Sequence, residues 1–115
     1  MSTVVLVGEV DGGGIKDVSQ QVAGVAAGMG EVVGLVMGKT ISEAAMKLAS
    51  GKIVIAEDDA LEHYDPVKYA SVVSQVVEQN NATRVLMGAT TMGRDLGPRV
   101  AAELGWSYLG DCLEA

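Results

Sequence analysis

The segment 88–99, Gly-Ala-Thr-Thr-Met-Gly-Arg-Asp-Leu-Gly-Pro-Arg, has the residue types of an anion-binding loop at the start of a helix. Two hydroxyls and a planar guanidinium can contact a phosphate, and small residues leave room for one. A turn that caps its own helix would use the same threonines and glycines. The segment matches neither a P-loop nor a GxGxxG motif, so both interpretations stay open. The candidate residues for an anion site or an interface are Gly88, Thr90, Thr91, Gly93 and Arg94.

A second group of chemically capable residues is acidic: Glu57-Asp58-Asp59, with Glu62 and His63 close behind. Carboxylates and imidazole bind metals, but this spacing matches no calcium loop. His63 is the only histidine, and no Ser or Cys nucleophile is arranged beside it. We therefore expect no metal site, no catalytic set and an ordered, solvated loop here.

The composition indicates a globular chain of 115 residues, 49% hydrophobic and 20% charged. Its net charge of −7 would repel nucleic acid, and no basic cluster suggests binding to an anionic membrane. One cysteine, Cys112, excludes an internal disulfide and is typical of a reducing cytosol. Met1-Ser2-Thr3 enters an apolar run without a basic leader, and Glu31 interrupts the other long apolar stretch. We expect a soluble, cytoplasmic protein without membrane insertion.

Apolar runs of strand length alternate with segments of helical periodicity along the whole chain. This alternation predicts right-handed crossovers, a parallel sheet and one domain spanning residues 1–115. The expected fold class is α/β, a three-layer α/β/α sandwich around five parallel strands. The predicted strands are Thr3–Val10, Val32–Met37, Lys52–Ala56, Arg84–Gly88 and Trp106–Leu109.

Residues with known preferences for helix ends mark the helices between these strands. Asp65-Pro66 is the strongest signal, because aspartate caps free N–H groups and proline suits the first helical position. Thr40 followed by Glu43 has the spacing of a capping box. Gly30 stands where a left-handed cap would end the first helix, near 17–29.

The last helix contains an awkward residue. Leu96, Val100, Ala101 and Leu104 form an apolar stripe, yet Pro98 lies inside it and removes a backbone donor. Either this helix begins late or it is kinked at the proline. Gly105 is the predicted C-terminal cap.

Several segments together resemble the alpha subunit of electron transfer flavoproteins. They are the opening strand with its glycine loop through 4–13, the Leu-Glu-His-Tyr-Asp-Pro run at 61–66, the segment 88–99 and the closing Asp111-Cys112. The resemblance covers essentially the whole chain in the right order. It identifies the chain as similar to the N-terminal domain of that subunit.

The resemblance implies an adenine-nucleotide-hydrolase-like fold with strand order 3-2-1-4-5. It implies a heterodimer with a beta subunit that carries AMP, and electron transfer from flavin dehydrogenases to an acceptor. FAD would bind in a C-terminal domain of the full-length subunit, which this sequence does not include. On this view the chain is not an enzyme, binds no FAD itself and serves as a scaffold for its partners. Isolated from them, it would expose an apolar face and is expected to self-associate.

An alternative interpretation is a stand-alone nucleotide-binding domain resembling universal stress proteins. AMP or ATP would then bind at the switch point between the first and fourth strands. The segments 8–14 and 88–94 would flank that ligand.

Overall fold

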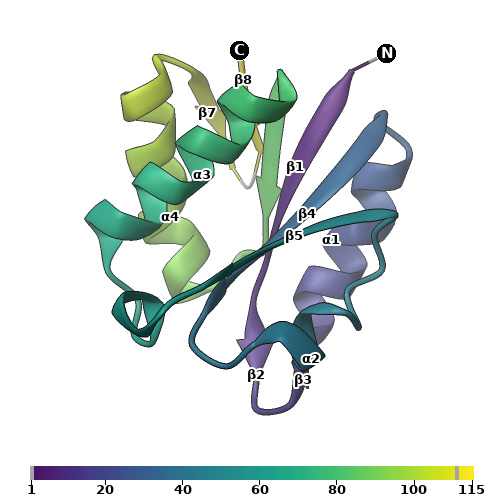
Figure 1. Ribbon diagram of the computed structural model, residues 1–115. Helices are drawn as coiled ribbons and strands as arrows, with labels where there is room; N and C mark the ends of the chain where they lie inside the picture. Colours follow the sequence, from purple (N-terminus) through teal and green to yellow (C-terminus); the bar gives the residue numbers. More distant parts are fainter. Residues whose placement is uncertain (1, 111) are drawn as a thin grey trace.

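The computed structural model describes residues 2–110 and 112–115 (Figure 1). Met1 of the expected leader-free start and Asp111 of the closing Asp-Cys pair lie outside the described residues. The strands are β1 (Thr3–Gly8), β2 (Val10–Asp11), β3 (Gly14–Ile15), β4 (Glu31–Gly38), β5 (Lys52–Glu57), β6 (Arg84–Met87), β7 (Ser107–Leu109) and β8 (Cys112–Glu114). The helices are α1 (Asp17–Ala27), α2 (Ser42–Ala45), α3 (Pro66–Asn80) and α4 (Thr91–Leu104), with a 3-10 turn η1 (Asp59–Leu61).

The main sheet confirms the predicted fold class, and it differs from the expectation at one edge. Its order is β5-β4-β1-β6-β8-β7, and β5, β4, β1 and β6 are parallel, as expected for the first four predicted strands. The fifth predicted strand, β7, does not pair with β6. Instead β8 lies between them, antiparallel to both. The reason is apolar burial: Leu113 of β8 is fully buried opposite Val85, whereas Leu109 of β7 is 65% exposed.

Helices cover both faces of the sheet, with α1 and α2 on one side and α3 and α4 on the other (Figure 1). Side chains of β1 alternate between the two resulting cores. Val5 and Val7 belong to the core under α3 and α4, while Val4 and Leu6 belong to the core under α1 and α2. All four are fully buried, which explains the continuous apolar run in this part of the sequence. Among the described residues, no helix is long and apolar enough to cross a bilayer.

Two predicted helix ends are confirmed. Asp65 Oδ1 accepts hydrogen bonds from the N–H groups of Val67 and Lys68, and Pro66 is the first residue of α3. Gly105 ends α4 in the left-handed conformation, with φ of 69°.

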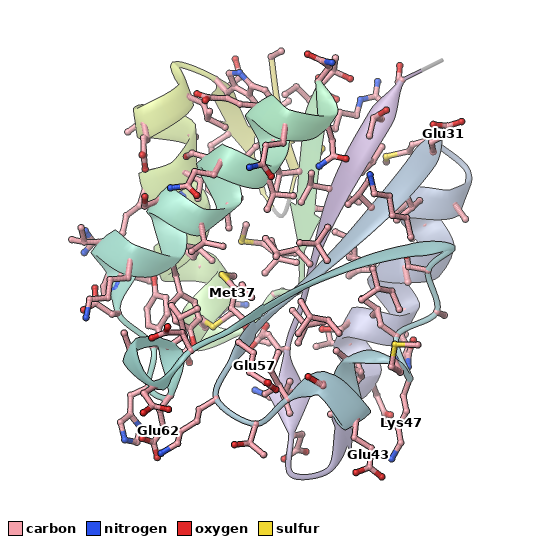
Figure 2. The ribbon with its side chains drawn as sticks, in the orientation of Figure 1. Glu31, Met37, Glu43, Lys47, Glu57 and Glu62 are labelled. Carbon is pink, nitrogen blue, oxygen red and sulfur yellow. The ribbon has the colours of Figure 1, made fainter. Side chains whose placement is uncertain are left out.

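Other helix ends differ from the prediction. The Thr40–Glu43 capping box is wrong: the carboxylate of Glu57, at the end of β5, accepts from the N–H groups of Ile41 and Ser42 at 2.7 and 2.9 Å. Figure 2 shows Glu43 and Lys47 extending outward from this region, while Met37 points into the interior. The sequence pattern missed Glu57 because it reaches α2 from another strand.

The first helix also ends earlier than expected, and the last one begins early. Gly28 caps α1 in the right-handed conformation, so Gly30 is not its cap. The helix α4 starts at Thr91 and continues through Pro98, which excludes a late start. The described structure therefore makes the segment 91–97 part of a helix rather than of a loop.

A cleft at the carboxyl edge of the sheet

Two adjoining cavities lie at the carboxyl edge of the parallel strands. At this edge β1 leads toward α1 on one face of the sheet, and β6 leads into α4 on the other face. Neighbouring strands that send their helices to opposite faces leave a crevice between them. The cavities have volumes of about 430 Å³ and 830 Å³. Both are lined in part by Glu9, Lys16, Tyr64 and Met92.

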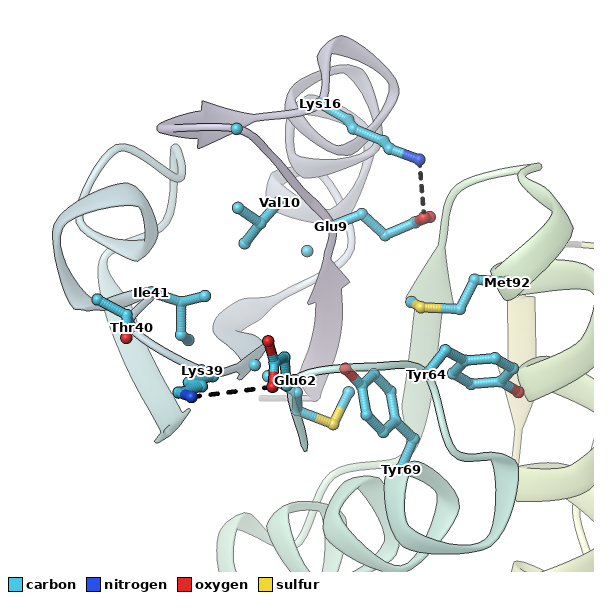
Figure 3. A pocket seen from close by; sticks show the side chains of 14 residues that line it. Glu9, Val10, Lys16, Lys39, Thr40, Ile41, Glu62, Tyr64, Tyr69 and Met92 are labelled. Carbon is cyan, nitrogen blue, oxygen red and sulfur yellow. Dashed lines mark hydrogen bonds and ion pairs between the residues drawn. The ribbon is translucent and has the colours of Figure 1, made fainter. Parts of the chain in front are cut away.

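The first cavity is lined by both apolar and charged side chains (Figure 3). The apolar lining residues come from β2, β4, α3, α4 and the N-cap of α2, and the rim carries an ion pair between Lys39 Nζ and Glu62 Oε2 at 3.8 Å. The ring of Tyr69 meets that of Tyr64 edge to face, with centroids 5.1 Å apart. Its hydroxyl donates a hydrogen bond to the carbonyl of Leu61 at 2.7 Å. The apolar lining residues are Val10, Met37, Ile41, Tyr69 and Met92.

Glu9 is one of the residues that line both cavities. Its side chain is 5% exposed, and it is the first residue after β1. Its Oε1 lies 3.4 Å from Lys16 Nζ, and its Oε2 accepts a 2.5 Å hydrogen bond from the Thr90 hydroxyl. The Glu9 N–H donates to Ser19 Oγ at 2.9 Å, and its carbonyl accepts from the Lys16 N–H at 2.9 Å. Both backbone groups and both carboxylate oxygens of Glu9 therefore have partners within the chain.

The segment 88–94 turns tightly from β6 into α4. Thr90 is the N-cap of α4, and its hydroxyl oxygen accepts from the Gly93 N–H at 3.0 Å while donating to Glu9. A Cβ atom at Gly93 would overlap the carbonyl oxygen of Gly88, and one at Gly88 would lie 3.0 Å from the Val18 side chain. Both glycines thus permit close packing of this turn. Their spacing in the sequence could not distinguish this role from that of leaving space for a bound phosphate.

The remaining predicted site residues line the second cavity. Thr91 and Arg94 are exposed on its wall, next to Thr90. Of the five candidates, Thr90, Thr91 and Arg94 come together at the cleft, and Gly88 and Gly93 form the turn beneath them. Sequence reasoning missed Glu9, although its place directly after the central strand β1, at the carboxyl edge of the sheet, is a position where ligands are often contacted.

A hydrogen-bonded group at the outer side of the second cavity was also missed. The Tyr64 hydroxyl donates to Asp95 Oδ2 at 2.6 Å, and Arg99 Nε lies 3.1 Å from the same oxygen. Burial, and then the hydrogen bond to Asp95, raises the pKa of the Tyr64 phenol. The hydrogen bond from Tyr64, supported by Arg99, lowers the pKa of the Asp95 carboxyl.

The acidic residues near His63 do not converge. Besides Glu57, which caps α2, Asp58 caps η1 through the Ala60 N–H at 2.8 Å. His63 is exposed. Within residues 2–110 and 112–115, no group of three His, Cys, Asp or Glu side chains is placed to hold a metal ion.

Sheet order and cleft define a doubly wound α/β domain with its crevice at the carboxyl edge. The sequence model of the family described as "Electron transfer flavoprotein domain" matches residues 3–115. The chain therefore belongs to the electron transfer flavoprotein family. This confirms the resemblance inferred from the sequence.

Three relatives illustrate the similarity. The chain is 32% identical to the electron transfer flavoprotein subunit alpha of Bacillus subtilis (strain 168) over 117 residues, which covers 96% of this chain and 36% of the relative. It is 33% identical to the corresponding subunit of Megasphaera elsdenii, over 89% of this chain and 32% of the relative. It is 35% identical to the acryloyl-CoA reductase electron transfer subunit beta of Anaerotignum propionicum, over 71% of this chain and 23% of the relative. The chain spans about a third of the length of the first two relatives.

Proposed function

We propose that this chain is the scaffold and subunit-interaction domain of an electron transfer flavoprotein. The observation that carries the proposal is the coverage: nearly the whole chain matches subunits named alpha, and it does so over only about a third of their length. On this proposal it corresponds to their N-terminal domain. It would shuttle no electrons unaided, but would position a flavin domain and a beta subunit in the cytoplasm.

FAD belongs, in this proposal, to the part of the full-length subunit that this chain does not match, and AMP to the partner subunit. The residues of the cleft do not fit a dinucleotide. The buried carboxylate of Glu9 lies at the switch point, where a pyrophosphate would meet a like charge. We therefore derive no redox step from this chain.

The exposed part of the segment 88–99 is the surface that we assign to the beta subunit. Arg94 and Thr91 lie exposed at the cleft, Asp95 directly follows Arg94, and Arg99 lies about one turn further along α4. Charged side chains of both signs on one helical turn can pair with complementary charges across an interface.

Co-expression with the beta subunit encoded in the same genome tests the proposal. We expect the two chains to co-purify and to elute together from size exclusion at a mass above the 11.8 kDa of this chain. Failure of the chain to bind the beta subunit, while both are folded by circular dichroism, would contradict the proposal.

A charge-reversal pair tests the assigned surface. Arg94→Glu should weaken binding of the beta subunit at least tenfold if Arg94 pairs with a carboxylate across the interface, as charge pairs at interfaces commonly do. Lys68→Glu is the matched control, because Lys68 is an exposed cation on α3. Equal affinities for the two variants would move the interface away from the segment 88–99 without contradicting the scaffold role.

A further inference from the structure

We propose that the Glu9 carboxylate is an internal anion that occupies the phosphate position of the cleft and excludes phosphate-bearing ligands from it. The inference concerns this chain's own chemistry and does not depend on the proposed electron-transfer role. The segment 88–94 then combines the two roles considered for it, an anion-binding loop and a self-capping turn. It does bind an anion, and that anion is the carboxylate of Glu9 from the same chain.

The position of Glu9 is the first argument. It follows β1 directly, at the edge where β1 and β6 diverge toward opposite faces of the sheet. Its Oε2 reaches the N-terminus of α4 through the hydroxyl of Thr90, the N-cap residue. The free N–H groups and the dipole at the start of this 14-residue helix favour a negative charge.

The way in which Glu9 is held is the second argument. Its side chain is 95% buried, since 5% of it is exposed, and its two oxygens contact Lys16 and Thr90. Ser19, which accepts from the Glu9 N–H, is itself completely buried. Contacts hold both the backbone and the side chain of Glu9, so its carboxylate is preorganised. Moving the carboxylate out of the cleft would break several of these contacts (Figure 3).

The groups around Glu9 are those that would otherwise recognise a phosphate. Lys16 supplies an ammonium, Thr90 and Thr91 supply hydroxyls, and Arg94 lines the same cavity. With Glu9 in place, a phosphate in this cavity would lie beside a like charge in a partly buried site, where solvent screens repulsion poorly. Without Glu9, the carboxylate left in the lining of this cavity would be that of Asp95, which already accepts from Tyr64 and pairs with Arg99.

Thermal-shift titrations of the 115-residue chain with inorganic phosphate and with AMP test this inference, because a ligand that binds the folded state raises Tm. Wild-type chain should show no saturable shift beyond that of chloride at matched ionic strength. Glu9→Ser, which removes the carboxylate and frees its volume, should show a saturable rise in Tm with phosphate. A lower apparent Kd is expected for AMP, whose base can enter the first cavity.

Glu62→Gln is the charge-matched control. Glu62 lines the first cavity and pairs with the exposed Lys39, so its loss changes the net charge equally without touching Thr90. It should leave the chain unresponsive to phosphate. Adding Lys16→Met to Glu9→Ser should abolish the gained binding.

Three results would overturn the inference. They are saturable phosphate or AMP binding by wild type, no gain by Glu9→Ser, and a gain that survives Lys16→Met unchanged. If Glu9→Ser does not fold, Glu9→Ala removes the carboxylate and its volume without placing a new hydroxyl in a buried position, and the same criteria apply to it. Chemical-shift changes of the Thr90 and Gly93 amides on adding phosphate would place the gained site independently.

Discussion

At the scale of single residues, the Thr90 hydroxyl forms two hydrogen bonds with different roles. It accepts from the Gly93 N–H and donates to Glu9. Thr90→Val keeps the shape of the side chain and removes both bonds, leaving a buried carboxylate with fewer partners. We expect a loss of about 1–2 kcal/mol in the free energy of unfolding from the cap, and more from Glu9. Urea denaturation measures this loss.

Thr91→Val is the control for that measurement. Thr91 is exposed and follows Thr90 directly. Its substitution should change the free energy of unfolding by no more than about 0.5 kcal/mol. Equal losses for the two variants would mean that the Thr90 hydroxyl contributes nothing specific.

Tyr64 gives the chain an alkaline limit to its stability. Its folded-state pKa lies above the ordinary value of 10.0, so the folded state holds the phenolic proton more tightly than the unfolded state does. This contribution is fully present below pH 10 and is lost as pH rises beyond it. Tyr64→Phe should flatten the fall of Tm above that pH. An unchanged alkaline slope in Tyr64→Phe would assign the limit to other groups.

At the scale of elements, α2 depends on a carboxylate from β5. Glu57 accepts from the Ser42 hydroxyl and from two backbone N–H groups, which lowers its pKa below 4.5. The stability that it contributes is present above pH 4.5 and is lost as pH falls through the lower folded-state pKa. Acid titration followed by circular dichroism should show a shallower acid limb for Glu57→Gln than for wild type.

Glu43→Gln separates the observed cap from the one that the sequence predicted. Glu43 has capping-box spacing from Thr40, but α2 has no cap hydrogen bond from its own N-cap side chain. Its neutralisation should leave the acid limb unchanged. If Glu43→Gln flattened the acid limb as much as Glu57→Gln does, Glu43 would cap α2 as the sequence predicted.

The strand β8 tests the one edge at which the sheet departs from the expectation. Leu113 is fully buried between the sheet and α4, whereas Leu109 on β7 is 65% exposed. Leu113→Ala should lower the free energy of unfolding by about 2–5 kcal/mol. Leu109→Ala should stay within about 0.5 kcal/mol. The reverse order, measured by urea denaturation, would place β7 in the inner position.

Elements were predictable from the sequence where a local signal sets them. Asp65-Pro66 at the start of α3 and the apolar run of β1 need only neighbours along the chain. Glu57 and Leu113 were not predictable in their roles, because a cap from another strand and an antiparallel insertion depend on contacts distant in sequence. The same distinction holds for the residues of the cleft. Thr90 was predictable from the local motif 88–94. The role of Glu9 was not, because it depends on a contact with Thr90, 81 positions away in the sequence.

At the scale of the whole molecule, we expect the isolated chain to self-associate. Exposed apolar side chains lie on several elements, among them Val67 at 74% and Met46 at 69% exposure. The net charge of −7 keeps copies apart at low salt, so added salt should strengthen association by screening that repulsion. Light scattering across concentration and ionic strength measures this. A constant mass of 11.8 kDa under all conditions would contradict the expectation.

The central strand β1 couples the stability of the two helical layers. Its side chains alternate between the two cores, so neither layer of helices can separate from the sheet without exposing part of the same six residues. Opening one side therefore loosens the support of the other. The backbone amides of β1 should exchange with deuterium only when the entire molecule unfolds, whereas those of β7, at the rim of the sheet, should exchange through local opening.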